Sequence, residues 1–188
     1  MPNADRPGFM PADRKPSEEL LFKIDASNST NVFVGDVMDS NAAGSVRPAA
    51  GSAPTQTIGV VVALYDANNV PVGAPNSIHS TKYLPSGYVG YALIALALPG
   101  RRFIGQAITG KTPAAADVFA TSDITAGTGD TVTGRSGHEL TYTALNTEGQ
   151  CFILGKVDSP DNEWGEYCKL YFCFNEGQLM GTGKSIGV

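Results

Sequence analysis

Short apolar runs divided by turn-forming residues make up the hydrophobic pattern of this 188-residue chain. The runs are rich in β-branched and aromatic residues, and Gly, Pro, Asn or Asp stand near their ends, as is typical of β-strands. The run at 57–65 is almost continuously apolar, which predicts a strand buried on both faces. We therefore predict an all-β fold, a β-barrel or β-sandwich with long loops, and strands at 20–24, 32–38, 57–65, 88–98, 102–109, 150–157 and 166–174.

Two turn sequences suggest how neighbouring strands connect. The segment Asp66-Ala67-Asn68-Asn69 is a strong turn signal, so 70–72 is expected to begin the return arm of a hairpin. Pro99-Gly100 is expected to close a second hairpin between the two runs that flank it. The length of 91–98 also suits a short helix, but the Pro-Gly turn and the strand-like neighbour favour the hairpin.

Two further segments are expected to be irregular. The Ala-, Gly- and Ser-rich stretch at 40–55 predicts a surface loop, long enough to suggest contact with a partner. One helical turn is expected at 112–116, with Thr112 as its cap and Pro113 at its first position.

The first 19 residues predict an extended N-terminal arm, and residues 20–188 a single β domain. Prolines at positions 2, 7, 11 and 16 remove amide donors, and Phe9 and Met10 are the only large apolar groups. Ordering such a segment costs about 1–2 kcal/mol per residue in backbone entropy. We expect the arm to become ordered only against a partner, or else to be a plain disordered tail, and its deletion to leave the domain folded.

Composition and charge exclude several classes of partner. The net charge is −5, and the basic cluster Arg101-Arg102 is too small to contact a phosphate backbone, so no nucleic-acid partner is expected. No run approaches the roughly 18 apolar residues of a membrane-spanning helix. The N-terminus lacks the apolar core of a signal peptide, which predicts assembly in a cytoplasm.

The chain has three cysteines, Cys151, Cys168 and Cys173, and the odd number favours reduced, buried thiols. Cys168 and Cys173 lie five positions apart, so on one strand they would point to opposite faces. A pair between Cys151 and either of the others remains open as the alternative.

Two motifs imitate catalytic or nucleotide-binding sequences. Gly181-Thr182-Gly183-Lys184-Ser185 resembles the end of a phosphate-binding loop, but the required earlier Gly is Gln178, and only three residues follow. Gly134-Arg135-Ser136-Gly137-His138 imitates a hydrolase nucleophile elbow, but His138 replaces the final Gly. Asp130 and Glu139 lie nearby without the spacing of an orienting third group. No catalytic residues are therefore predicted.

Metal and sugar sites are also not predicted. His79, His138 and the cysteines show no ligand spacing typical of a metal site. The acidic groups at 158–163 could bind calcium, but a solvated turn explains them better. A sugar-binding platform could be built from the aromatic residues Tyr83, Tyr88, Tyr91 and Trp164. Core packing or interface contact explains these residues equally well. We therefore expect no metal and no cofactor.

The Gly-rich stretch at 117–140 contains a series of short motifs. The strand-like run Cys151-Phe152-Ile153-Leu154-Gly155 follows them. The motifs are Asp117-Val118, Asp123-Ile124, Ala126-Gly127-Thr128-Gly129, Thr133-Gly134-Arg135-Ser136 and Glu139-Leu140. This order resembles a pattern in virion structural proteins of tailed bacteriophages, particularly capsid decoration or cement proteins. The resemblance covers 102–157, and Asp130 departs from it, because the pattern has a small residue there.

The resemblance implies a non-enzymatic β-protein of the virion that binds the outer surface of an icosahedral head. Its implied partners are the major capsid protein and copies of itself, with a trimer favoured, and the arm would lie across the shell. Each copy would bridge adjacent capsomers, and many weak contacts would together stabilise the head. The alternative is another virion component, such as a head fibre, a tail part or a glycan-binding β module.

Overall fold

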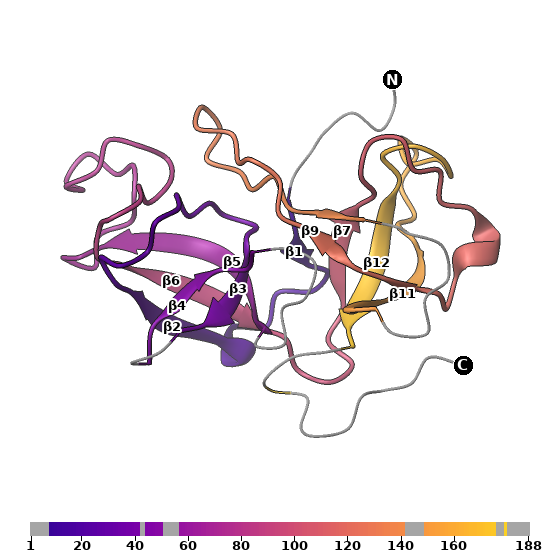
Figure 1. Cartoon of the computed structure of the whole chain (residues 1–188), viewed down its shortest axis with the longest axis horizontal. Coiled ribbons are helices and arrows are strands. Elements are labelled where there is room, and N and C mark those ends of the chain that lie inside the picture. The colour runs from indigo at the N-terminus through magenta and orange to yellow at the C-terminus, as the bar shows by residue number, and fades with distance from the viewer. Residues whose placement is uncertain (1–7, 42–43, 51–56, 142–148, 176–178, 180–188) are drawn as a thin grey trace.

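The computed structural model describes residues 8–41, 44–50, 57–141, 149–175 and 179. It confirms the all-β prediction: two five-stranded antiparallel sheets and a two-stranded ribbon lie in a sandwich-like arrangement (Figure 1). Helical structure in the described residues is short and of the 3₁₀ type, and includes η1 (Pro16–Glu18) and η3 (Ala115–Asp117). None of these is long and apolar enough to cross a membrane.

The first sheet contains the most apolar runs of the N-terminal half, and its edge strands β2 and β4 approach each other, so the sheet is strongly curled. The predicted loop at 40–55 is wrong where β4 forms, because Val46 is buried and pairs with Ser40. The strand order is β2 (Glu19–Ile24), β6 (Gly90–Leu96), β5 (Thr57–Asp66), β3 (Val37–Ser40) and β4 (Val46–Pro48).

The predicted strand at 32–38 is only partly formed, because a turn interrupts it. The Asp36 amide donates to the Phe33 carbonyl at 3.2 Å, and Gly35 adopts a φ of 95°. Val32 and Val34 on the near side of this turn make only isolated bridges, and β3 begins at Val37.

The second sheet collects the C-terminal strands and a short piece of the N-terminus. Strands β11 and β12 confirm the predictions at 150–157 and 166–174. The strand order is β1 (Met10–Pro11), β7 (Phe103–Gln106), β12 (Lys169–Phe174), β11 (Cys151–Lys156) and β8 (Thr121–Ser122).

The predicted hairpin across Pro99-Gly100 is wrong, although strands stand on both sides of the turn. β6 pairs with β2 on one edge and β5 on the other, so it has no free edge for β7. The chain therefore crosses to the second sheet, where β7 pairs with β1 and β12. Buried Arg101 holds the crossing, because its guanidinium donates to the Glu18 carbonyl at 2.6 Å and lies 5.7 Å from the Phe103 ring centre.

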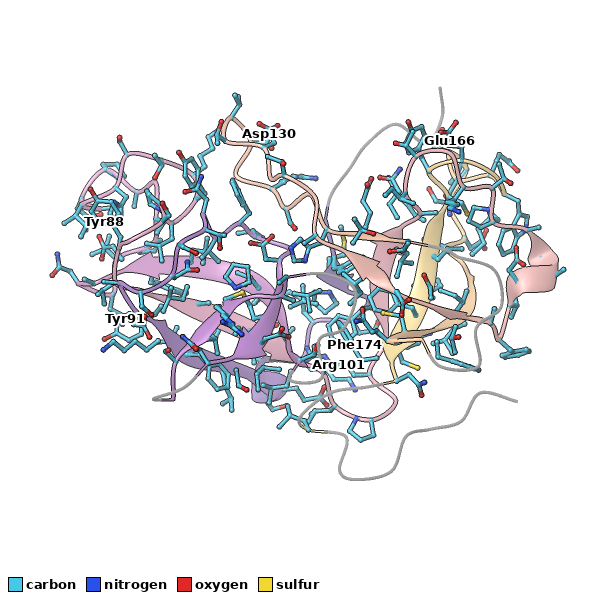
Figure 2. All side chains as sticks on the ribbon, viewed as in Figure 1. Tyr88, Tyr91, Arg101, Asp130, Glu166 and Phe174 are labelled. Carbon is cyan, nitrogen blue, oxygen red and sulfur yellow. The ribbon has the colours of Figure 1, made fainter. Side chains whose placement is uncertain are left out.

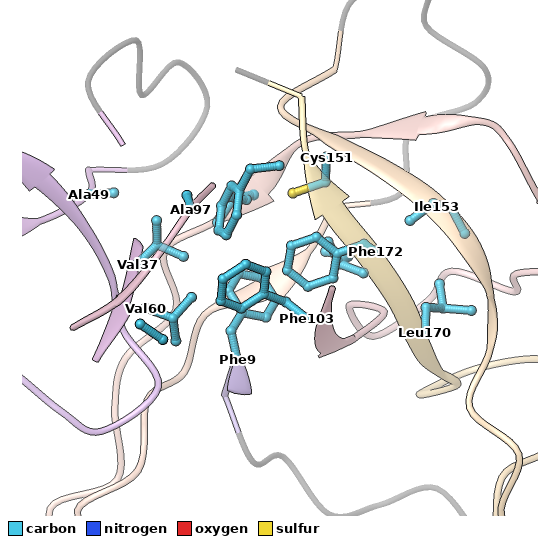
Figure 3. Close-up of a cluster of buried hydrophobic side chains, with 14 of the residues drawn as sticks. Phe9, Val37, Ala49, Val60, Ala97, Phe103, Cys151, Ile153, Leu170 and Phe172 are labelled. Carbon is cyan, nitrogen blue, oxygen red and sulfur yellow. The ribbon is translucent and has the colours of Figure 1, made fainter. Parts of the chain in front are cut away.

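Two apolar clusters hold the sheets. One lies between them and draws Val37 and Val60 from the first sheet, and Phe103 and Phe172 from the second (Figure 3). The other fills the concave face of the first sheet and contains Val61, the neighbour of Val60. Strand β5 is thus buried on both faces, as its continuous apolar run predicted.

Residues 8–19 pack against the domain, and the expectation that they order only against a partner is wrong. The Phe9 side chain is 1% exposed and belongs to the cluster between the sheets. β1 pairs with β7, and Arg14 forms a bidentate ion pair with Glu19. The remainder of the predicted arm, 1–7, lies outside the described residues.

The predicted turn at Asp66 to Asn69 is confirmed, and Asp66 fixes the loop that follows it. Its buried carboxylate accepts bonds from the amides of Asn68, Val70 and Ile78 and from the Ser77 hydroxyl. Burial opposes ionisation, but these donors outweigh it and lower the pKa of Asp66. The return arm is reduced to a bridge from Tyr65 to Pro71.

The predicted helical turn at 112–116 instead begins at Ala115, as η3.

All three cysteines are free thiols, which agrees with the expectation of reduced cysteines and not with the alternative disulfide. Cys151 and Cys168 are buried, and Cys173 is half-buried. Burial raises the pKa of the Cys168 thiol to about 11, so this thiol remains protonated near neutral pH.

Candidate functional site

Residues 126–138, here called the strap, connect the two sheets. The strap lies between β9 (Ile124–Thr125) and β10 (Glu139–Leu140), which pair with each other beside the second sheet. Its far end folds back on itself, with the Asp130 amide donating to the Arg135 carbonyl at 2.8 Å. Two backbone bonds to Val34, from its amide to the Gly134 carbonyl and from the Ser136 amide to its carbonyl, dock the strap on the first sheet at the turn before β3 (Figure 1).

Glycines in the strap stand where two backbones meet. A Cβ on Gly127 would lie 2.0 Å from the Gly137 carbonyl oxygen, and one on Gly137 would lie 2.3 Å from the Thr128 carbonyl oxygen. A Cβ on Gly129 would lie 2.3 Å from the Phe33 ring. Close packing therefore explains the Gly-rich composition of this stretch in physical terms.

Three buried polar residues join the strap to the first sheet: Asp36, Ser136 and His138. They are 3%, 3% and 4% exposed, respectively. The His138 amide donates to the Ser136 hydroxyl oxygen at 3.0 Å, and the Ser136 hydroxyl donates to the Asp36 carboxyl group. The other Asp36 partner is the Phe33 amide, which donates to Oδ2 at 2.8 Å.

The protonation of His138 follows from its contacts. The Val37 amide donates to Nδ1 at 3.1 Å, so the ring proton resides on Nε2, which lies 3.7 Å from Asp36 Oδ1. Burial lowers the pKa of His138, and the Asp36 charge only partly opposes this shift. Burial likewise raises the pKa of Asp36 against the stabilising contacts of His138, Ser136 and Phe33. The imidazole is therefore neutral near pH 7.

These three residues are those of a hydrolase triad, but their contacts are different. A nucleophilic serine must donate its proton to a base, normally a histidine ring nitrogen. Ser136 donates to Asp36 instead, while the ring nitrogens of His138 face Val37 and Asp36. The group therefore acts as a buried polar tie between the strap and the first sheet.

Replacing Ser136 with Ala is expected to lower the free energy of unfolding by about 1–3 kcal/mol, because it removes a partner from buried Asp36. Urea denaturation measures this loss, and Ser80→Ala, at an exposed position, is the matched control. Binding to the protein's partner should not change. A variant of unaltered stability that has lost function would instead identify Ser136 as a reactive group.

A pocket of about 420 Å³ opens beside this tie. Asp36 and His138 lie at its buried end, together with the Phe33 side chain. Its rim is formed by exposed residues of two segments, among them Thr30 before the turn and Thr128 in the strap. The pocket thus combines an uncharged rim with two buried ionisable groups.

The other residues considered from the sequence do not converge. The Asp130 carboxylate caps the far end of the strap by accepting bonds from Val132 and Thr133, and Glu139 is buried in β10. Among the described residues, no three His, Cys, Asp or Glu side chains lie close enough to hold a metal ion. The phosphate-loop-like segment at 181–185 lies outside the described residues.

The aromatic residues considered as a sugar-binding platform are dispersed. Tyr83 stacks on Phe33, with ring centres 5.0 Å apart, and Tyr88 packs edge-on against His79. Trp164 packs on the cluster between the sheets. Tyr88 and Tyr91 lie toward one end of the molecule, on the first sheet (Figure 2). Glu166, two positions after Trp164 in the chain, lies toward the opposite end (Figure 2).

The sequence reasoning missed Asp36 as the third member of the tie. The available signal was a single acidic residue within the apolar run Val32-Phe33-Val34-Gly35-Asp36-Val37-Met38. A charge at such a position requires partners when it is buried. Apart from the Phe33 amide, those partners are Ser136 and His138 in the strap, about 100 positions away in the chain, as the separation of 101 between Val37 and His138 illustrates.

Compared with models of known protein families, with curated proteins and with solved structures, the chain shows no significant match.

Proposed function

We propose that this chain is a structural virion protein that decorates the outer surface of an icosahedral phage head. In this role it is non-enzymatic, it binds the major capsid protein, and it stabilises the head by bridging adjacent capsomers as a homo-oligomer, with a trimer favoured. The resemblance of the stretch at 117–140 supports the proposal, and so does a surface feature of the second sheet.

That feature begins with three in-register residues on the outer face of the second sheet. Met10 pairs with Ile104, and Ile104 pairs with Tyr171. Their strand neighbours Phe103 and Phe172 point into the core, so these three side chains point outward. In an antiparallel sheet with one face on the core, the outer face is ordinarily polar.

The apolar surface continues along β11. The Phe152 side chain is half-buried and lies 6.0 Å from the ring centre of Phe119, which is 62% exposed. The Arg102 guanidinium lies 5.7 Å from the ring centre of Tyr171. We call Met10, Ile104, Tyr171, Phe152 and Phe119 the apolar stripe.

The apolar stripe is the observation that carries a binding function. Met, Tyr, Phe and Arg are enriched in protein–protein interfaces, whereas Lys, Glu and Asp are depleted. Met10 and Phe119 are exposed and the other three are half-buried, and a group of apolar side chains on an outer face is a feature of interaction sites. A protein that spreads weak contacts over many copies on a shell needs such a surface and no catalytic cleft.

Quantitative mass spectrometry of gradient-purified virus particles from the source culture tests the proposal. The expected result is a copy number close to that of the main shell protein. A few copies per particle would instead indicate a tail or fibre component. Complete absence from the particles would refute the virion function.

A further inference from the structure

The pocket beside the strap carries a charge arrangement that the proposed function does not use. Of the described side chains that line it, only Asp36 and His138 are ionisable. The apolar part of the wall contains Phe33, Pro48 and Ala49, and the Phe33 ring is held in place by Tyr83. The remaining lining residues are small or carry hydroxyl or amide groups.

Asp36 lacks a cationic partner within the part of the chain that the structure describes. Its hydrogen-bond donors, the Phe33 amide and the Ser136 hydroxyl, are neutral. Among the described residues, the basic group near its carboxyl is His138, at 3.7 Å, which is beyond hydrogen-bond distance. His138 also keeps its Nδ1 lone pair for the Val37 amide, so it remains a neutral neighbour.

Buried carboxylates in proteins are usually paired with a cation or bound to a metal. A metal site would need several carboxylate or imidazole ligands, and no such group of three exists among the described residues. An organic cation needs only one carboxylate at the end of an apolar passage, together with hydroxyl groups at the entrance. Asp36 at the end of this pocket, with Thr30 and Thr128 at its rim, provides that arrangement.

We propose that this pocket receives a basic side chain, Lys or Arg, from a partner protein, whose cationic group pairs with Asp36. The aliphatic stem of such a side chain would pack along the apolar wall at Phe33, Pro48 and Ala49, as long basic side chains do elsewhere. The chain's net charge of −5 favours the approach of a basic segment. That the partner is the shell protein rests on the proposed function, whereas the cation site does not.

Nuclear magnetic resonance titration of the intact protein with N-acetyl-arginine amide and N-acetyl-lysine amide tests the site directly. We expect saturable shifts at the amides of Phe33, Val37 and Thr128. The neutral analogues N-acetyl-citrulline amide and N-acetyl-norleucine amide should bind at least about tenfold more weakly, because they leave the buried carboxylate unpaired. Equal binding of charged and neutral compounds, or binding of none, would refute the proposal.

Two variants locate the binding within the pocket. Asp36→Asn should weaken binding of the cationic compounds about tenfold, and Asp39→Asn, which changes a buried acid outside the pocket, should not. Ala126→Trp places a bulky group on the exposed rim and should also abolish binding, with the exposed Ala116→Trp as its control. Because Ala126 lies on the exposed rim, this variant remains decisive if Asp36→Asn fails to fold. Unchanged binding by Ala126→Trp would place the cation elsewhere and overturn the proposal.

Particle binding separates this proposal from the proposed function. If both are correct, Ala126→Trp protein should bind particles at least about tenfold more weakly than the parent protein. Cation binding by a protein absent from particles would refute the virion function and retain the site. Full particle binding by Ala126→Trp would retain the virion function and show that the pocket does not receive a shell side chain.

Discussion

Replacing Phe9 with Ala is expected to lower the free energy of unfolding by about 3–5 kcal/mol, the range for a large aromatic residue removed from a core. The ring is 1% exposed, and its centre lies 5.2 Å from that of Phe172 in an edge-on contact. It also fills the space above Gly105, where a Cβ would stand 2.4 Å from the ring. Truncation would therefore leave a cavity between the two sheets.

Met10→Ala is the matched control, because Met10 is the next residue and is 37% exposed on the outer face. It should cost less than about 1 kcal/mol, as surface substitutions usually do. Equilibrium urea denaturation of both variants at 25 °C gives the comparison. Equal stabilities would mean that residues 8–11 do not belong to the core. With Phe9 in place there, deletion of residues 1–19 should destabilise the domain, contrary to the expectation from the sequence.

The contact of Phe9 with the core could not be predicted from the sequence. The local sequence pattern indicates whether the segment forms a regular element, and not which of its side chains is buried. The prolines and alternating charges around Phe9 correctly indicate that the segment cannot form a regular element of its own. They carry no information on a single aromatic side chain that enters a core built by Phe103 and Phe172, which lie 94 and 163 positions later in the chain. Contacts of this kind depend on tertiary packing and leave no periodicity to detect.

Strands were predictable where burial imposes a local pattern. The β-branched run of β5 is buried on both faces, and the sequence indicated this directly. Strand pairing was harder to predict from the sequence, because it depends on which strand edges are free. The turn at Pro99-Gly100 has the composition of a hairpin, yet β2 and β5 occupy both edges of β6, so β7 must pair elsewhere.

The candidate site shows the same division between local and distant information. The sequence placed Ser136 and His138 in a loop and gave no orienting acid at useful spacing. The structure supplies Asp36 from the first sheet, but it directs the Ser136 proton to the carboxyl group and leaves His138 as an acceptor for Val37. Residue identity alone could not distinguish a buried tie from a triad, because the difference lies in which atoms face each other.

The strap provides the second large expected effect: Gly127→Ala should lower the free energy of unfolding by about 3 kcal/mol, at the upper end for inserting one carbon into a packed site. The new Cβ would lie 2.0 Å from the Gly137 carbonyl oxygen, so the two sides of the strap would have to separate. That separation would strain the bond from the Ser136 amide to the Val34 carbonyl, 2.9 Å long, which docks the strap on the first sheet.

Gly100→Ala is the informative comparison, because Gly100 has a φ of 75° and open space around it. It should cost about 1 kcal/mol from backbone strain alone. Urea denaturation gives the global stabilities, and hydrogen exchange at the Ser136 amide reports opening of the strap. In the Gly127→Ala/Gly137→Ala double variant, the loss should be smaller than the sum of the single losses, because one separation relieves both clashes. A Gly127→Ala variant no less stable than Gly100→Ala, with full protection at Ser136, would mean that the strap does not hold the two sheets together.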